Sequence, residues 1–245
     1  MTNLIVDEGN TLCKVAVMDK SELLCEFATP EFDFAAAAEL VEKWGVARAV
    51  VASTRGGAEK ICEKLRTKID GVLHFSSQTE VPIGIDYSSR QTLGADRVAV
   101  AVGVVCGMGI EDALIIDMGS AITFDVVEGG VFKGGNISLG VAMRFRALHE
   151  FTASLPLCGV KEPNGAFGKS TAEAVEQGVM QGVLHEIEGY VARVGGGNGE
   201  KKIIFCGGDA ESFVNRIKNA IFAPRKLMFT GLNEILEYNV SKGNI

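Results

Sequence analysis

The sequence predicts an α/β protein made of two related lobes. Two observations carry this prediction: a strand that ends in Asp-x-Gly occurs twice, and short apolar strands alternate with amphipathic helical segments. A chain of 245 residues can bury a sizeable core and divide into two lobes. We expect an N-terminal lobe over residues 1–108 and a C-terminal lobe over residues 109–245.

The repeated unit lies at residues 4–9 and again at residues 114–119. In each copy three apolar residues are followed by an aspartate, one further residue and a glycine, and the copies align without a gap. The aspartates are Asp7 and Asp117, and another apolar run follows each loop. A supersecondary unit repeated about 110 residues later indicates a duplicated domain, whose two loops we expect to face each other across a cleft.

Each copy offers the groups that a nucleotide phosphate needs. The carboxylate can hold Mg²⁺ or its water, the glycine lets backbone N–H groups approach a phosphate, and the hydroxyl of Ser120 adds a hydrogen bond. Asp-x-Gly is also an ordinary turn, so a single copy carries little weight. The pair resembles the phosphate clamp of the actin-like and sugar-kinase-like ATPases. That resemblance implies two related actin-like (ribonuclease H-like) lobes with a nucleotide cleft between them.

Hydrophobic spacing predicts the elements of the first lobe in order. The expected strands are a hairpin at residues 1–18, a third strand at 22–28 and a buried strand at 47–52, with helices at 34–44 and 59–69. Residues 85–87 look strand-like and give way to a polar bend. A helical pattern follows from Gln91, with Gly94, Ala95, Asp96 and Arg97 in its first turn.

The second lobe continues with strands and longer helices. The expected strands are one at 114–116, a second that ends at Val127, a third that starts at residue 131 and a fourth at 202–206. The expected helices lie at 139–155, from Ser170 to about Val194 and at 232–240. Ser170 and Glu173 form a capping box, and the apolar stripe of the helix that follows suits either lobe core or a dimer interface. Residues 163–170 resemble a Walker A loop, but Pro163 replaces its first glycine and no strand precedes it. Residues 195–199 read as a glycine-rich connector.

Composition excludes several classes of function. A net charge of −7 gives no electrostatic support for binding nucleic acid or an anionic membrane. The sequence shows neither a targeting segment nor an apolar run long enough to span a membrane. The six cysteines are scattered without a C-x-x-C pair, which is typical of reduced thiols in a cytoplasmic protein.

Five motifs occur in the order and spacing of the type III pantothenate kinases, over nearly the whole chain. They are Asp-Glu-Gly-Asn-Thr at 7–11, Gly-Ala-Asp-Arg at 94–97, the segment 117–125, Gly-Gly-Asn-Ile-Ser-Leu-Gly at 134–140 and Thr-Ala-Ser-Leu-Pro at 152–156. The resemblance implies ATP-dependent phosphorylation of pantothenate to 4'-phosphopantothenate, the first step of coenzyme A biosynthesis. It also implies a homodimer that requires Mg²⁺ with ATP, and K⁺ or NH₄⁺.

The resemblance assigns the pantothenate site to one segment. Asp96 matches the family's proton acceptor, which receives the proton of the pantothenate hydroxyl, and Tyr87 matches a tyrosine that contacts pantothenate. Gly94, Ala95 and Arg97 match the substrate-binding loop around it. Without the resemblance, the structural interpretation is that Asp96 satisfies free N–H groups of its helix and that Arg97 forms a surface ion pair.

The resemblance also assigns the ATP and cation sites. The first phosphate loop corresponds to Asp7, Glu8, Gly9, Asn10, Thr11, Leu12, Cys13 and Lys14. Ser120 matches a threonine that contacts ATP, and Asp117 matches a monovalent-cation ligand, although a carboxylate suits Mg²⁺ as well as K⁺. Thr171 matches a threonine that reaches pantothenate in its own or the partner subunit's site. Residues 207–209 resemble an adenosine-binding turn, and Asp125 has either a supporting or a structural role.

Two other classes of function remain open. One is a regulatory protein of the same fold, since members of the family have been described as transcriptional accessory factors. The other is a different small-molecule kinase or ATPase of the actin-like superfamily, which would share the phosphate loops without needing Tyr87, Asp96 and Arg97. The acidic charge argues against direct DNA contact, and the intact Gly-Ala-Asp-Arg motif argues for catalysis.

Overall fold

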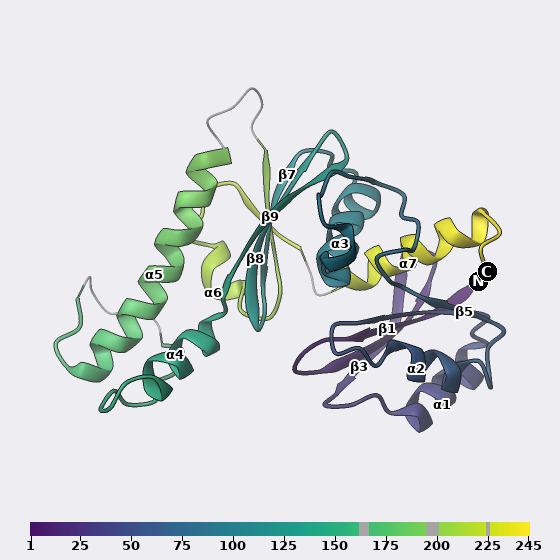
Figure 1. The fold of residues 1–245 in the computed structure, drawn as a ribbon, viewed down its shortest axis with the longest axis horizontal. Coiled ribbons are helices and arrows are strands. Elements are labelled where there is room, and N and C mark those ends of the chain that lie inside the picture. Colours follow the sequence, from purple (N-terminus) through teal and green to yellow (C-terminus); the bar gives the residue numbers. More distant parts are fainter. Residues whose placement is uncertain (162–166, 195–200, 224–225) are drawn as a thin grey trace. The chain divides into compact units, whose positions relative to one another are not determined.

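The computed structural model describes residues 1–161, 167–194, 201–223 and 226–245. The chain forms two compact units, which we describe separately (Figure 1). Unit 1 comprises Met1–Glu111, Val127–Gly134 and Pro224–Ile245, and unit 2 comprises Asp112–Val126 and Gly135–Ala223. Both contain strands and helices, so the predicted α/β class is confirmed.

Unit 1 is built on a five-stranded sheet with the order β3-β2-β1-β4-β5. The strands are β1 (Thr2–Glu8), β2 (Cys13–Asp19), β3 (Glu22–Thr29), β4 (Arg48–Ser53) and β5 (Gly71–His74). The first three form an antiparallel meander, as the hairpin prediction requires, whereas β1, β4 and β5 run parallel. The carboxyl ends of β1 and β4 therefore lie side by side, with Glu8 opposite Ser53.

Helices cover both faces of this sheet (Figure 1). Because side chains alternate along β1, Leu4 and Val6 pack in the core beneath α1 (Phe34–Trp44) and α2 (Ala58–Leu65). On the opposite face Asn3 donates a hydrogen bond of 2.8 Å to Asn233 in α7 (Lys226–Ser241).

Beside α7 lies α3 (Ala95–Val102), which continues as a π-helical turn over Gly103–Gly107. The two helices approach closely at Gly231. A Cβ atom placed there would lie 1.7 Å from the carbonyl oxygen of Ala99, so only glycine fits.

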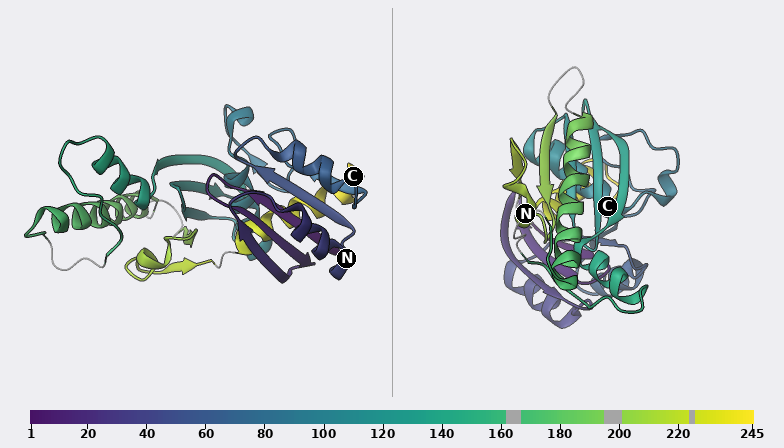
Figure 2. Two further views of the ribbon diagram at one scale, coloured as in Figure 1. Left: turned by 90° about the horizontal axis from the view of Figure 1, so that it is seen from below. Right: turned by 90° about the vertical axis from the view of Figure 1, so that its left-hand side faces the viewer.

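A six-stranded sheet has the order β11-β10-β7-β8-β9-β6. Its strands are β6 (Gly84–Ile85), β7 (Ala113–Met118), β8 (Ala121–Glu128), β9 (Val131–Leu139), β10 (Lys202–Cys206) and β11 (Ala220–Phe222). Unit 2 adds α4 (Val141–Glu150), α5 (Thr171–Val194) and α6 (Glu211–Val214). The green helix α5 runs along one face of the sheet, where Val179, Val183 and Ile187 join the core with Phe124 (Figure 2).

Three predicted helices differ from the structure at their ends. The helix expected at 59–69 ends at Leu65, and the one expected at 232–240 begins earlier, at Lys226. The helix expected at 139–155 is α4, which ends at Glu150. Just beyond its end the hydroxyl of Thr152 donates to the carbonyl of Leu148 at 2.7 Å, which satisfies a terminal acceptor of the helix.

The start of α5 confirms half of the predicted capping box. Ser170 accepts a hydrogen bond from the backbone N–H of Glu173 at 3.3 Å. The carboxylate of Glu173 accepts instead from the backbone N–H of Lys169, at 2.7 Å. Residues 163–166, half of the Walker-like stretch, and the glycine-rich connector fall outside the described residues.

The expected lobes, residues 1–108 and 109–245, remain a prediction about two related halves. The compact units are divided differently, because α7 packs against β1, β4 and α3 and so joins unit 1 at the end of the chain. All six cysteines carry free thiols, as expected from their scattered positions.

Candidate active site

The first candidate loop connects β1 to β2 in unit 1. Asp7 is buried at the end of β1 and pairs across the hairpin with Lys14, whose Nζ lies 3.8 Å from a carboxylate oxygen of Asp7. The backbone N–H of Gly9 donates to the carbonyl of Leu12 at 3.0 Å and closes a tight turn. Asn10, Thr11 and Leu12 are exposed at its tip, whereas Cys13 returns into the core. The structure thus buries the carboxylate and presents the turn to solvent.

Burial raises the pKa of Asp7 to about 6, with a smaller lowering by Lys14 and a raising by the carboxylate of Asp96. Burial acts in this direction because removing water destabilises the charged form. The contribution of Asp96 shows that the first loop and the predicted substrate segment lie close enough within unit 1 to interact electrostatically.

The predicted substrate segment forms the start of α3. Gly94 is its N-cap, and Asp96 and Arg97 lie in the first turn, as the sequence predicts. The carboxylate of Asp96 accepts a hydrogen bond of 2.9 Å from the backbone N–H of Arg97, so it does satisfy a helix N–H group. A Cβ atom at position 94 would lie 2.5 Å from that carboxylate, so a larger residue would displace the Asp96 side chain from this position. The side chain of Asp96 remains partly exposed and available to a substrate.

Arg97 lies against two aromatic rings. Its guanidinium carbon is 5.8 Å from the ring centre of Tyr87 and 5.6 Å from that of Phe132. The two rings meet edge to face at 6.1 Å. Arg97 is only 7% exposed, so the surface position considered for it is wrong. Cation–π contacts of this kind fix the direction of a buried guanidinium.

Phe132 was not predicted as a site residue. Phe132 joins the site because β6 pairs with the start of β9, which places Ile85 opposite Phe132. Tyr87, two residues after Ile85, then lies against the ring of Phe132. A second contact fixes this strand, since Lys133 pairs with Asp86 at 3.1 Å. The apolar pair Val131-Phe132 predicts a strand, but only the pairing with residues 84–85 reveals its partner.

The second candidate loop follows β7 in unit 2. Asp117 lies near the end of the strand, and the backbone N–H of Gly119 donates to the carbonyl of Ala121 at 3.0 Å. Ser120 is exposed, and its carbonyl accepts from the backbone N–H of Gly140 at 3.2 Å. Gly140 is also the N-cap of α4, so the start of this helix lies directly against the loop.

The glycine turn after β10 packs on the same loop. Gly207 has a φ of +90°, and a Cβ atom there would lie 2.5 Å from a carboxylate oxygen of Asp117. The backbone N–H of Asp209 donates to the carbonyl of Met118 at 3.1 Å. The turn predicted to lie against adenosine is therefore brought to the second loop by backbone contacts that a larger residue would prevent.

The donor chemistry fits a hard cation. Carboxylate and hydroxyl oxygens, as in Asp117 and Ser120, suit both Mg²⁺ and K⁺. In the parts of the chain that the structure describes, no group of three or more His, Cys, Asp or Glu side chains could hold a metal alone. This is compatible with Mg²⁺ bound through one or two carboxylates together with phosphate and water. Asp125 is buried in β8, where it accepts from the hydroxyl of Thr123 at 3.0 Å.

Thr171 lies apart from these loops along the chain, at the first residue of α5. It lines a groove of about 720 Å³ between α4 and α5. The groove is mainly apolar, and Phe151 on its wall is 85% exposed. Arg144 fastens α4 to α5 through an ion pair with Glu186. Over the described residues, no helix is long and apolar enough to cross a membrane.

Comparison with known proteins shows a consistent family. A profile described as type III pantothenate kinase matches residues 3–193. A type III pantothenate kinase of Phocaeicola vulgatus is 36% identical over 238 residues, which cover 97% of this chain and 98% of that protein.

Solved structures show the fold. A Campylobacter jejuni protein assigned to the Baf family of transcriptional activators has a TM-score of 0.65 at 22% identity, over 97% of this chain and 99% of that one. An activator of 2-hydroxyisocaproyl-CoA dehydratase from Clostridium difficile, solved with bound ADPNP, has a TM-score of 0.58 at 14% identity, over 100% and 98% of the two chains. These likenesses confirm the predicted actin-like fold class.

The buried carboxylate of Asp7 predicts a pH-dependent effect on stability. Because its pKa rises to about 6 on folding, the folded state binds its proton more tightly than the unfolded state, and the stability that this gives is lost as pH rises through 6. Asp7→Asn removes a buried charge and should raise the free energy of unfolding by about 2–3 kcal/mol at pH 8. The gain should vanish below about pH 4. Urea unfolding in EDTA at both pH values measures this.

The matched control is Asp70→Asn, which changes an exposed carboxylate. Equal effects of the two substitutions at pH 8, or an Asp7→Asn gain that persists at pH 4, would contradict the assigned role of burial.

Proposed function

Because the chain belongs to the type III pantothenate kinase family, we propose that its two strand-end loops bind ATP and that the segment at residues 87–97 binds pantothenate. The enzyme transfers the terminal phosphoryl group of ATP to the hydroxyl of pantothenate and so begins coenzyme A biosynthesis. The observation that carries the residue assignment is the partly exposed Asp96 beside a buried Arg97 that rests on Tyr87.

Asp96 orients the acceptor hydroxyl. A carboxylate is a far weaker base than the alkoxide that it would have to generate from an alcohol. In a loose phosphoryl-transfer transition state the proton leaves late, so the main contribution of the carboxylate is to hold the hydroxyl oxygen in line with the phosphoryl group. Its hydrogen bond from the Arg97 N–H fixes the carboxylate for this purpose.

Arg97 and Tyr87 recognise the body of pantothenate. Buried between Tyr87 and Phe132, the guanidinium has a fixed direction, and it can donate charge-assisted hydrogen bonds to the polar groups of the substrate. The phenol ring of Tyr87 supplies an apolar face and a hydroxyl. A different kinase of the superfamily would have no need of this combination.

ATP is held by backbone N–H groups and by cations. The exposed turn at residues 9–12 presents backbone groups to a phosphate, and Lys14 adds a positive charge beside Asp7. Ser120 supplies a hydroxyl to ATP, and Asp117 supplies a carboxylate oxygen to K⁺ or NH₄⁺. Mg²⁺ bound with ATP would neutralise charge on the phosphates.

The monovalent cation can be tested by replacing it. With ATP and Mg²⁺ constant, replacing K⁺ or NH₄⁺ by tetramethylammonium should lower pantothenate-dependent turnover by about an order of magnitude, because that ion is too large for an oxygen-lined site. Asp117→Asn should reduce the difference between the two salts. Full activity without K⁺ and NH₄⁺ would refute the cation assignment.

The catalytic role of Asp96 predicts a selective loss. In an ADP-release assay with ATP, Mg²⁺ and K⁺, the wild-type enzyme should release ADP only with pantothenate. Asp96→Asn should lower this turnover by about 10²–10⁴-fold and leave the affinity for ATP, measured by calorimetry, nearly unchanged. Asp70→Asn serves as the control for an exposed aspartate.

Near-normal turnover of Asp96→Asn would sink the assignment of the catalytic residue. ADP release by the wild type that ignores pantothenate would remove the substrate but keep an ATPase of this fold. ATP binding without any ADP release would favour a regulatory protein.

We propose further that the enzyme is a cytoplasmic homodimer joined along the groove between α4 and α5. The apolar lining of the groove and the exposed Phe151 and Leu157 provide a surface that a second copy can cover. Because Thr171 lines this groove, it would then lie at the partner's surface and serve the partner's site. The six free thiols suit a reducing compartment.

Phe151→Glu should therefore give a monomer, measured by size-exclusion chromatography with light scattering, because it places a charge in an apolar interface. Phe222→Glu, at a phenylalanine that is 45% exposed on β11, should leave a dimer. Equal masses for both variants and the wild type would contradict the interface.

A mixing experiment decides which site Thr171 serves. Mixed dimers of Asp96→Asn and Thr171→Ala carry one intact site if Thr171 acts across the interface, so the mixture should exceed the average activity of the two variants. Activity equal to that average assigns Thr171 to its own subunit.

A further inference from the structure

Two exposed arginines that have no role assigned above, Arg55 and Arg90, hold the substrate-binding parts of unit 1 through main-chain carbonyls. We infer that Arg55 positions the ATP-binding turn at residues 9–12 and that Arg90 positions the pantothenate-binding segment at residues 87–97. This inference rests on the proposed function of those two segments. In this inference each arginine acts through the backbone that it holds, as a positioning residue.

Arg55 grips the tip of the ATP-binding turn. Its Nε and Nη2 atoms both donate to the carbonyl of Asn10, at 3.2 and 2.8 Å. Its Nη1 atom donates to the carbonyl of Pro30 at 2.9 Å, beyond the end of β3. A planar guanidinium reaches both oxygens at once with little loss of freedom, which a lysine cannot do. Arg55 therefore ties the turn to a second, independent part of unit 1.

The backbone of Arg55 is itself fixed against the turn. The hydroxyl of Ser53 donates to the carboxylate of Glu8 at 2.5 Å and accepts from the backbone N–H groups of Arg55 and Gly57 at 3.0 and 3.2 Å. The backbone N–H of Thr54 donates to the carbonyl of Glu8 at 2.9 Å. A Cβ atom at Gly57 would lie 2.5 Å from the Glu8 carboxylate, so the fit is close. The guanidinium is thus aimed by a framework that is already in place.

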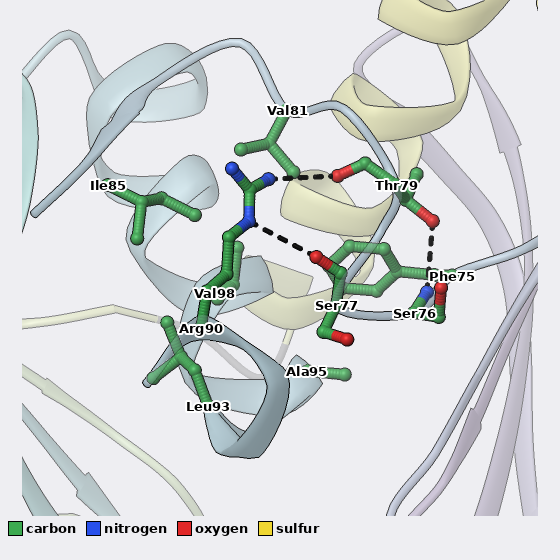
Figure 3. Close-up of a pocket in the computed structure, with 10 residues that line it drawn as sticks. All are labelled: Phe75, Ser76, Ser77, Thr79, Val81, Ile85, Arg90, Leu93, Ala95 and Val98. Carbon is green, nitrogen blue, oxygen red and sulfur yellow. Dashed lines mark hydrogen bonds between the residues drawn. The ribbon is translucent and has the colours of Figure 1, made fainter. Parts of the chain in front are cut away.

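Arg90 performs the same task for the other segment (Figure 3). It begins a single 3₁₀ turn, Arg90–Thr92, between Tyr87 and Gly94. Its Nε donates to the carbonyl of Ser77 at 3.1 Å and its Nη2 to the carbonyl of Thr79 at 3.2 Å. The segment that carries Tyr87 is therefore fastened to the turn that follows β5.

That turn is a firm support. The hydroxyl of Thr79 accepts from the backbone N–H of Ser76 at 3.0 Å and donates to the carbonyl of His74, the last residue of β5, at 3.2 Å. Figure 3 shows the Arg90 guanidinium directed toward Ser77 and Thr79, with Leu93 and Val98 on the wall of the same pocket. The pocket holds about 10 Å³, the space of one water molecule, so it is too small for pantothenate.

Holding these segments in advance reduces the conformational entropy that is lost when a substrate binds. A loop that is already held in its bound conformation loses less conformational freedom when its ligand arrives, which lowers the dissociation constant. Because each arginine holds a different segment, loss of Arg55 should weaken the binding of ATP, and loss of Arg90 should weaken the binding of pantothenate. This reciprocal pattern separates positioning from general destabilisation, which would affect both substrates alike.

The experiment compares Arg55→Ala and Arg90→Ala with Arg66→Ala. Arg66 is a matched control, because it is exposed in unit 1, as Arg55 and Arg90 are, and bonds Glu59 on α2 rather than either segment. For each variant the KM values for ATP and pantothenate come from ADP release, the dissociation constants of ADP and pantothenate from calorimetry, and the thermal midpoint from scanning fluorimetry.

Arg55→Ala should raise the KM for ATP and the dissociation constant of ADP by about 5- to 30-fold, with the pantothenate values changed less than about twofold. Arg90→Ala should show the reverse pattern, and Arg66→Ala neither. Arg55→Lys and Arg90→Lys should recover only part of the loss, because one ammonium cannot bond both carbonyls.

Equal changes in both substrates, or unchanged constants for both variants, overturn the inference. Full recovery by the lysine variants also overturns it, since charge alone would then suffice. These outcomes differ from failure of the proposed function, in which the wild type itself releases no ADP with pantothenate or binds no pantothenate. A wild type that is active while all three alanine variants behave alike leaves the proposed function standing and removes only the positioning roles.

Discussion

The parallel pairing of β1 with β4 is the constraint on which unit 1 depends. It makes β1 a central strand, buries Asp7 at its end and brings Glu8 opposite Ser53. Since the two carboxyl ends meet at one edge of the sheet, the connection after β4 lies against the turn after β1. The hydroxyl of Ser53 then links the side chain of Glu8, at the end of β1, to the backbone N–H of Arg55 in the connection after β4. The geometry of the ATP-binding turn is therefore a property of two strands and not of the hairpin alone.

Burial of Asp7 opposes this arrangement energetically. Burial raises the pKa of Asp7 to about 6, so near neutral pH the charged form is destabilised relative to the unfolded chain. Lys14 offsets part of this cost from across the hairpin, but at 3.8 Å and with half of its own side chain exposed it cannot offset all of it. A site that keeps a costly carboxylate near a phosphate loop is typical of function, where stability gives way to a required charge.

The sequence predicts most of the fold because its elements follow simple periodicity. The opening hairpin, α1, β7 and the long α5 agree with their predicted ranges closely, since strand and helix patterns there are uninterrupted. The ends of helices are predicted less well: α4 ends at Glu150, and the hydrogen bond from Thr152 to the carbonyl of Leu148 beyond it is not encoded by hydrophobic spacing. Predicting Phe132 as a site residue requires knowing that β9 pairs with β6, a strand distant in sequence. Arg55 and Arg90 leave no sequence signal, because they bond carbonyl oxygens, which every residue carries.

The two candidate loops reach rigidity by different physical means. In unit 1 the turn at residues 9–12 projects into solvent, so side chains must reach in from neighbouring connections to hold it. In unit 2 the loop at Asp117 is held by close backbone approach, in which Gly140 and Gly207 leave no space for a Cβ atom. Glycine contacts fix a loop only where other backbone is already adjacent, whereas an arginine can span open space. The second loop therefore tolerates few substitutions at its glycines, while the first depends on side chains that lie outside the recognised motif.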